Sequence, residues 1–252
     1  MAGVHKPGQP GDLPDAGVLW RRWAGAALAM YDHEQEGTAA VHRTGCWIDD
    51  AGLHWDDSGC TWWEFKWFGD GRAVLFGEDE TSQVKWHEPA IDVLAGAPQW
   101  VPRRYLRGLI DAYMVGCVYW FEDGAWHRAP YPDDLRDDGL GSGVGRLTTR
   151  AGALETISLW RDSGATDPEL CERLLDAAER GAVTEDLVRT CAEGLSLLAE
   201  EDEEEEDLFE EDDDPEEESA PDADSVVAAV FALAQRAGLD TVTWTGTLGV
   251  RD

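Results

Sequence analysis

Residues 61–80 read TWWEFKWFGDGRAVLFGEDE, and this stretch decides the fold. Asp70-Gly71 stands between two runs in which apolar residues alternate with others, as in a β-strand. Asp-Gly favours a two-residue type I′ turn, because both central positions of that turn need a positive φ. The stretch therefore predicts a β-hairpin closed at Asp70-Gly71, in which Trp67 pairs with Val74. On this register one face of the hairpin carries Trp63, Phe65, Trp67, Val74 and Phe76.

Two further stretches repeat this pattern of aromatic residues followed by a turn. Residues 120–124 read WFEDG, and a turn at Asp123-Gly124 pairs Phe121 with Trp126. A third hairpin, around Ala51-Gly52, is expected to have a slightly longer loop. The sequence therefore predicts an α+β fold: an antiparallel sheet of two to three Asp-Gly or Ala-Gly hairpins with packed helices.

Apolar residues spaced three and four apart predict helices in both halves of the chain. Asp167 followed by Pro168 is typical of a helix start, and Gly181 of a helix end. Thr184 is the predicted cap of the next helix. The predicted helices span 16–31, 102–114, 168–181, 184–198 and 225–236, and a short β-like segment spans 241–245.

Changes of composition divide the chain into four parts. Residues 1–15 are rich in Gly and Pro and are expected to form a flexible leader, followed by an aromatic-rich α+β domain over 16–138. Four glycines between 139 and 149 predict a joint. Residues 150–252 form a helical part that contains an acidic loop.

This acidic loop covers residues 200–224, with eighteen Asp or Glu residues and no Lys or Arg. Like charges repel one another, and Leu208 and Phe209 are the only large apolar residues available for packing. The loop is therefore predicted to be disordered.

The formal net charge of −33 restricts the partners of the protein. A chain this acidic is repelled by free nucleic acid and by anionic membranes, and is attracted to basic proteins. No apolar run approaches the length of a membrane helix, and the five cysteines are scattered. We expect a cytoplasmic protein with a basic protein partner.

Four residues with nitrogen and sulfur donors suggest a metal site. His42, Cys46, His54 and Cys60 follow the spacing H-x3-C-x7-H-x5-C, which matches no common zinc motif. The alternative is that they are ordinary sheet residues with one or two buried thiols. No cofactor is predicted, and zinc at these residues is the weaker hypothesis.

Thirteen tryptophans are more than a core of this size requires. Strand alternation puts Trp63 and Trp67 on one face of the sheet, and Trp62 with Phe68 on the other. Exposed aromatic clusters are typical of binding surfaces. The alternative is that helices cover both faces. The candidate binding residues are Trp62, Trp63, Trp67, Phe68, Trp120 and Trp126.

The sequence contains no phosphate-binding loop, nucleophile elbow or paired metal-binding histidines on a helix. It therefore favours a non-catalytic acidic protein that binds a basic partner, in its sharpest form an immunity protein or an antitoxin. Two alternatives stay open. One is a metal-dependent enzyme without a recognisable motif. The other is a regulatory or scaffold protein whose acidic loop masks Arg103, Arg104 and Arg107 as an autoinhibitory contact.

Overall fold

The structure is a computed structural model, and it describes residues 4–32, 43–142, 144–160, 167–195 and 222–241. The predicted acidic loop lies outside these ranges except for its last three residues, which belong to the start of a helix. The predicted β-like end also lies outside them, apart from Thr241.

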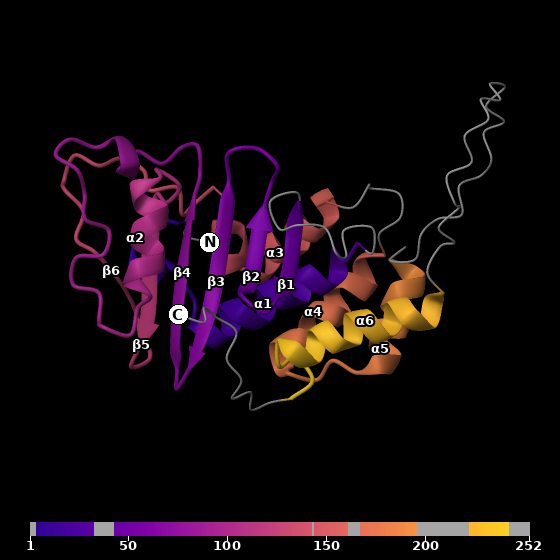
Figure 1. Cartoon of the computed structure of the whole chain (residues 1–252). Coiled ribbons are helices and arrows are strands. Elements are labelled where there is room, and N and C mark those ends of the chain that lie inside the picture. Colours follow the sequence, from indigo (N-terminus) through magenta and orange to yellow (C-terminus); the bar gives the residue numbers. More distant parts are fainter. Residues whose placement is uncertain (1–3, 33–42, 143, 161–166, 196–221, 242–252) are drawn as a thin grey trace, which may run out of the picture.

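The described residues contain six antiparallel strands in one sheet, arranged in chain order (Figure 1). Together with the helices they confirm the α+β class. The strands are β1 (Gly45–Asp49), β2 (Gly52–Asp56), β3 (Trp62–Gly69), β4 (Arg72–Glu78), β5 (Cys117–Glu122) and β6 (Ala125–Arg128). Each strand pairs with its neighbours in sequence, so three consecutive hairpins build the whole sheet.

The central hairpin, β3–β4, turns where the sequence predicts, but its register differs. Asp70 and Gly71 have φ values of 50° and 69°, as a type I′ turn requires. A β-bulge between Trp67 and Gly69 leaves one extra residue in β3, so Trp67 pairs with Ala73 and not with Val74. The predicted face was therefore wrong for β4, because a shift of one residue moves a side chain to the other face.

The other two hairpins differ in how well the sequence predicts them. Phe121 pairs with Trp126 across the Asp123-Gly124 turn, which confirms the predicted register. In the first hairpin Asp49 pairs directly with Gly52. Its loop therefore contains only two residues, and the expected longer loop was wrong.

The helices begin and end close to the predicted residues. Side chains of Asp167, Thr184 and Asp222 each accept a backbone N–H at a helix start, and Gly181 ends a helix with a φ of 64°. One helix, α3, was not singled out from the sequence. The helices are α1 (Ala16–Ala29), α2 (Arg103–Asp111), α3 (Arg150–Trp160), α4 (Pro168–Arg180), α5 (Glu185–Gly194) and α6 (Ala223–Arg236).

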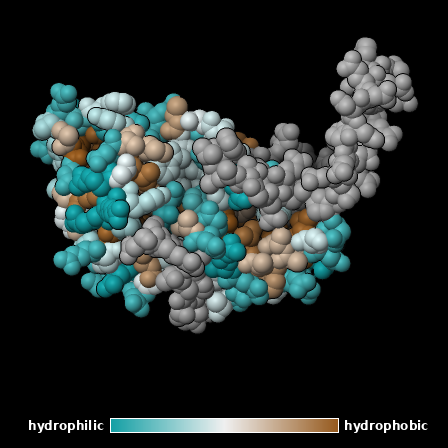
Figure 2. Space-filling model, in the orientation of Figure 1, coloured by the Kyte–Doolittle hydropathy of each residue, from teal (hydrophilic) through white to brown (hydrophobic). Residues whose placement is uncertain are grey.

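Helices cover both faces of the sheet (Figure 1). The α1 face forms one core with α3 to α6, in which Trp20 and Trp23 pack around Phe65. The α2 face forms a second core around Phe76 and Leu106. The visible surface is mostly hydrophilic, with apolar residues showing near α2 and near α5 and α6 (Figure 2).

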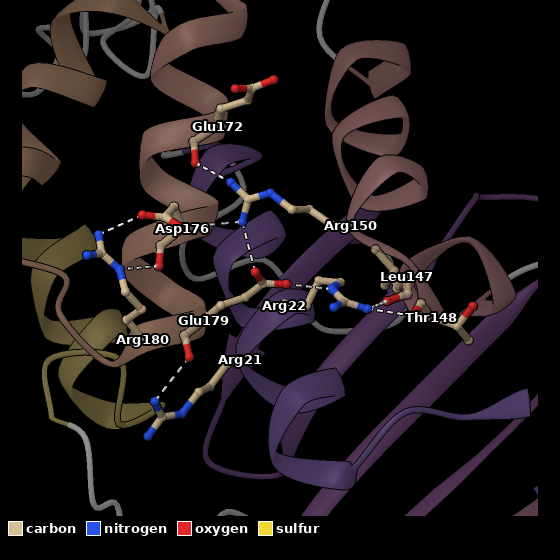
Figure 3. A network of polar contacts seen from close by, with 9 residues as sticks. All are labelled: Arg21, Arg22, Leu147, Thr148, Arg150, Glu172, Asp176, Glu179 and Arg180. Carbon is tan, nitrogen blue, oxygen red and sulfur yellow. Dashed lines mark hydrogen bonds and ion pairs between the residues drawn. The ribbon is translucent and has the colours of Figure 1, made fainter. Parts of the chain in front are cut away.

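An ion-pair network joins α1, α3 and α4 around one carboxylate (Figure 3). Glu179 Oε1 accepts a 2.8 Å hydrogen bond from Arg22 Nε, and Oε2 accepts one of 2.8 Å from Arg150. Arg22 also donates to the carbonyl oxygens of Leu147 and Thr148. Because these residues come from distant parts of the sequence, Glu179 holds the helical layer together behind the sheet.

The segment before α1 also contacts the body of the protein. Lys6 Nζ lies 2.6 Å from Asp137 Oδ2, and the Gly8 N–H donates to Asp138 Oδ1 at 2.8 Å. Asp138 is buried and also accepts a 2.7 Å hydrogen bond from the Tyr119 hydroxyl. These contacts join residues 4–8 to the segment that follows β6. The division into leader, domain, joint and helical part stays a prediction.

Candidate functional site

The six candidate aromatic residues lie in or against the two cores. Strand alternation is as predicted: Trp63 and Trp67 pack in the α1 core, while Trp62 and Phe68 pack against the α2 core. Helices cover both faces, as in the alternative interpretation, so these rings contribute most of their area to packing. A binding role for them stays a prediction. Trp63, Trp120 and Trp126 are buried, and Trp62, Trp67 and Phe68 are half-buried.

The four candidate metal ligands have different surroundings. His42 lies outside the described residues. Cys46 is buried, and its burial raises the pKa of the thiol, whereas Cys60 is exposed. Among the residues that the structure describes, no three His, Cys, Asp or Glu side chains gather as a metal site would require. His54 instead forms a hydrogen bond with the carboxylate of Asp49.

His54 and Asp49 form a pair on the α2 face of the sheet. His54 Nε2 donates a 2.8 Å hydrogen bond to Asp49 Oδ1, and the imidazole stacks on Trp47 with ring centroids 4.9 Å apart. Burial acts to raise the pKa of Asp49. The hydrogen bonds from His54 and the Ala51 N–H, together with the charge of Lys66, outweigh that effect and lower this pKa to about 2. Asp49 is therefore ionised at neutral pH.

Lys66 forms a second buried pair next to the first. Its side chain is only 2% exposed, and its Nζ lies 2.7 Å from Glu64 Oε2 and 3.0 Å from the carbonyl oxygen of Ala51. The ammonium also lies 5.3 Å from the ring centroid of Tyr105 on α2. A cation with this many close partners is a fixed structural charge, and it helps to hold α2 on the sheet.

The sequence contains a signal for this pair that was missed. Glu64 and Lys66 are two residues apart in a strand otherwise rich in aromatic residues, so both side chains point to one face. A pair of opposite charges at that spacing, in a strand covered on both sides, indicates a buried ion pair. This ion pair is easily overlooked beside the large aromatic residues of the same strand.

The exposed aromatic residues gather elsewhere. Trp86, Tyr113 and Met114 are 68%, 61% and 47% exposed, and we call them the aromatic patch. The rings of Trp86 and Tyr113 stack with centroids 5.8 Å apart, and Lys85 Nζ lies 5.4 Å from the Trp86 ring. None of the three was among the candidate binding residues, because Tyr113 and Met114 fall at the end of the predicted helix 102–114 and Trp86 lies outside the predicted hairpins.

A hollow of about 380 Å³ adjoins the aromatic patch and runs between α2 and the segment 84–93. Its walls include apolar side chains such as Ile91, Val93 and Ile110, and its charged residues are Lys85, Arg107, Asp92 and Asp111. Both cations have partners: Lys85 lies 2.7 Å from buried Glu78, and Arg107 lies 3.1 Å from Asp92. We call this hollow the α2 groove.

A strongly acidic surface lies at another place, on α4, α5 and the start of α6. Residues 167–195 contain eight acidic residues against three arginines. Asp222 and Asp224, at the start of α6, are exposed as well. We call the surface formed by α4, α5 and the start of α6 the acidic end. The predicted acidic loop stands between α5 and α6 in the sequence, and sixteen of its eighteen carboxylates lie outside the described residues.

Comparisons of the chain with protein families, with curated proteins and with solved structures found no match. In the described part of the chain, no helix is both long enough and apolar enough to cross a membrane.

Proposed function

We propose that this protein is a non-catalytic acidic protein that binds a basic protein partner through its acidic end. In the sharpest form of the proposal, the partner is a cationic toxin and the protein is its immunity protein or antitoxin. The observation that carries the proposal is the concentration of negative charge on α4, α5, the start of α6 and the loop between the two last helices.

Charge of this density acts mainly on the rate of association. A single-sign surface attracts a cationic partner over about 10 Å at moderate ionic strength and orients it before contact. The net charge of −33 extends the same field over the rest of the molecule. A basic nuclease-like partner would meet carboxylates in the region where it otherwise binds phosphate.

The arrangement of the helices favours a separate partner over an internal clasp. Arg103, Arg104 and Arg107 lie on α2, which covers one face of the sheet at one side of the molecule. The helices α5 and α6, which flank the acidic loop, lie at the opposite side (Figure 1). The acidic end therefore lies away from Arg103, Arg104 and Arg107 of its own chain.

Affinity capture from a native lysate, followed by mass spectrometry, tests the proposal. The test variant carries Glu169→Gln, Asp186→Asn and Glu193→Gln, three exposed positions on α4 and α5. The matched control carries Glu88→Gln, Asp123→Asn and Asp133→Asn, which are equally exposed but lie outside the acidic end. Both variants lose the same charge.

We expect one basic protein to be retained at high salt by the wild type and by the control variant. The purified pair should associate more slowly when the acidic end is neutralised, with a rate that falls as salt rises. If every captured protein is washed off when the salt concentration is raised, the proposal is wrong. It is also wrong if both variants lose the partner equally.

A further inference from the structure

The aromatic patch and the α2 groove lie beside the most basic helix of an acidic protein. The helix α2 reads RRYLRGLID, with three arginines against one aspartate. Arg103 and Arg107 have partners, since Arg103 donates to the Ala97 carbonyl oxygen and Arg107 pairs with Asp92. Arg104 is exposed and makes no ion pair with the residues that the structure describes. This surface therefore suits a ligand that is both apolar and acidic.

The chain itself contains such a ligand. Residues 203–212 read EEEEDLFEED, in which two large apolar residues stand between carboxylates. Leu208 and Phe209 match the apolar side chains of the groove next to exposed aromatic rings, and the flanking acids match the exposed Arg104 on α2. No other stretch of the sequence combines high negative charge with an isolated pair of large apolar residues.

The position of the flanking helices indicates which copy supplies the segment. Leu208 is separated from Leu195 and from Asp222 by a similar length of chain, which fully extended spans about 45 Å. The helices at those two residues lie on the opposite side of the fold from α2 (Figure 1). A second copy supplies the segment without this constraint, and two copies that exchange segments form a closed symmetric pair.

The backbone conformation at the aromatic patch also indicates a binding role. Tyr113 follows α2 with a φ of 58°, and the next residue, Met114, donates its N–H to the Leu109 carbonyl oxygen at 2.9 Å. This is the helix-ending position at which glycine is favoured, because a side chain there costs about 1 kcal/mol. Tyr113 at this position therefore lowers the stability of the fold. Its ring stacks on Trp86 and stays exposed to solvent.

We propose that Leu208 and Phe209 of one copy dock on the aromatic patch and the α2 groove of a second copy. The carboxylates beside them pair with Arg104 and reach the other arginines of α2. The interaction makes the protein self-associate, and it covers part of the acidic loop in the absence of another partner. It involves only this chain, so it does not depend on the proposed function.

A labelled peptide of residues 203–212 tests the docking directly. The receptor is the protein with residues 200–221 replaced by a Gly-Ser linker of equal length, so that its own segment is absent. We expect saturable binding by fluorescence polarisation, and a loss of at least tenfold when Leu208 and Phe209 of the peptide are both changed to Ala. A salt dependence should accompany it, because the flanking contacts are ionic.

Receptor variants locate the site. Tyr113→Gly should weaken peptide binding while leaving the thermal stability equal or higher, because glycine fits the backbone better. Arg104→Glu should also weaken it, whereas Arg173→Glu, an exposed arginine on α4, should leave it unchanged. If Tyr113→Gly binds the peptide as well as the wild type does, the assigned site is wrong.

Sedimentation of the full chain decides whether a second copy is the source. We expect a sedimentation coefficient that rises with protein concentration, and loss of that rise in a Leu208→Ala, Phe209→Ala variant and in Arg104→Glu. A full chain that stays monomeric at concentrations where the peptide binds would overturn the second-copy assignment. Failure of this experiment leaves the capture of a basic protein unaffected, so the two proposals fail separately.

Discussion

His54 Nε2 lies 2.8 Å from Asp49 Oδ1, and this bond ties the end of β1 diagonally to β2 beside the first turn of the sheet. The two residues are five apart in sequence, and neither belongs to the apolar core beneath α2. The pair therefore adds a polar contact to a hairpin whose other face, with Ile48 and Leu53, packs in the α1 core.

The lowered pKa of Asp49 predicts how stability depends on pH. Its ordinary value is 3.8, and the folded protein lowers it to about 2. The unfolded chain binds more protons between these values, so the stabilising contribution is present above about pH 4 and is lost as the pH falls through 2. After a discount for partial exposure, the contribution is about 1–2 kcal/mol.

Urea titrations at pH 6, 4 and 2.5 measure the contribution of Asp49 to the free energy of unfolding. Asp49→Asn should be less stable than the wild type at pH 6, and the difference should shrink as the pH falls. A difference that stays constant over this range would mean that the carboxylate is not perturbed.

Glu179 is expected to contribute strongly to the stability of the helical layer. Glu179→Gln removes the charge that Arg22 and Arg150 share, and leaves the buried guanidinium of Arg22 with fewer partners. Loss of charged hydrogen bonds of this kind costs about 1–3 kcal/mol. Chemical denaturation checks the value, with Glu172→Gln as the control, because Glu172 contributes only its carbonyl oxygen to the network. Equal effects of the two substitutions would contradict the assigned role.

Two glycines should respond to alanine in opposite directions. A Cβ at Gly116 would lie 2.2 Å from Glu78 Oε2 and 2.6 Å from Ser82 Oγ, both of them buried side chains. Gly116→Ala should therefore destabilise the protein by about 1–3 kcal/mol. A Cβ at Gly108 in α2 would meet nothing within 4 Å, so Gly108→Ala should stabilise it by about 0.5–1 kcal/mol. Thermal melts of the two variants give the signs directly.

The acidic loop should be dispensable for folding. Its eighteen carboxylates repel one another, and α6 keeps its own cap at Asp222. Replacing residues 200–221 with a Gly-Ser linker of equal length should leave a single cooperative melt, with the midpoint unchanged or slightly raised. Loss of cooperativity in calorimetry would show that the loop contributes to the core.

Turn chemistry made the hairpins predictable, and one bulge limited the prediction. Asp-Gly at 70–71 and at 123–124 located two turns correctly, because few dipeptides accept two positive φ values. The local sequence does not indicate that Phe68 is an extra residue in β3. That single residue moves Val74 to the other face of the sheet.

The candidate site was harder to predict, because it depends on tertiary packing. Alternation separates the two faces of β3 correctly, but it does not tell whether a helix covers each face. Helices lie on both faces, and the rings that remain exposed are those of Trp86, at the end of a short 3-10 helix, and Tyr113, just past the end of α2. Their proximity arises from the packing of α2 on the sheet.

The chain has only three lysines, and each of them is bonded to a carboxylate: Lys6 to Asp137, Lys66 to Glu64, and Lys85 to Glu78. Acylation of any of these amines would remove the cation and leave its acid unpaired. A reagent or enzyme that modifies lysine side chains therefore has to break an ion pair at each of the three. Their side chains are 55%, 2% and 21% exposed in that order, so Lys6 should react first and Lys66 last. The rate of lysine acylation thus reports on the integrity of the fold.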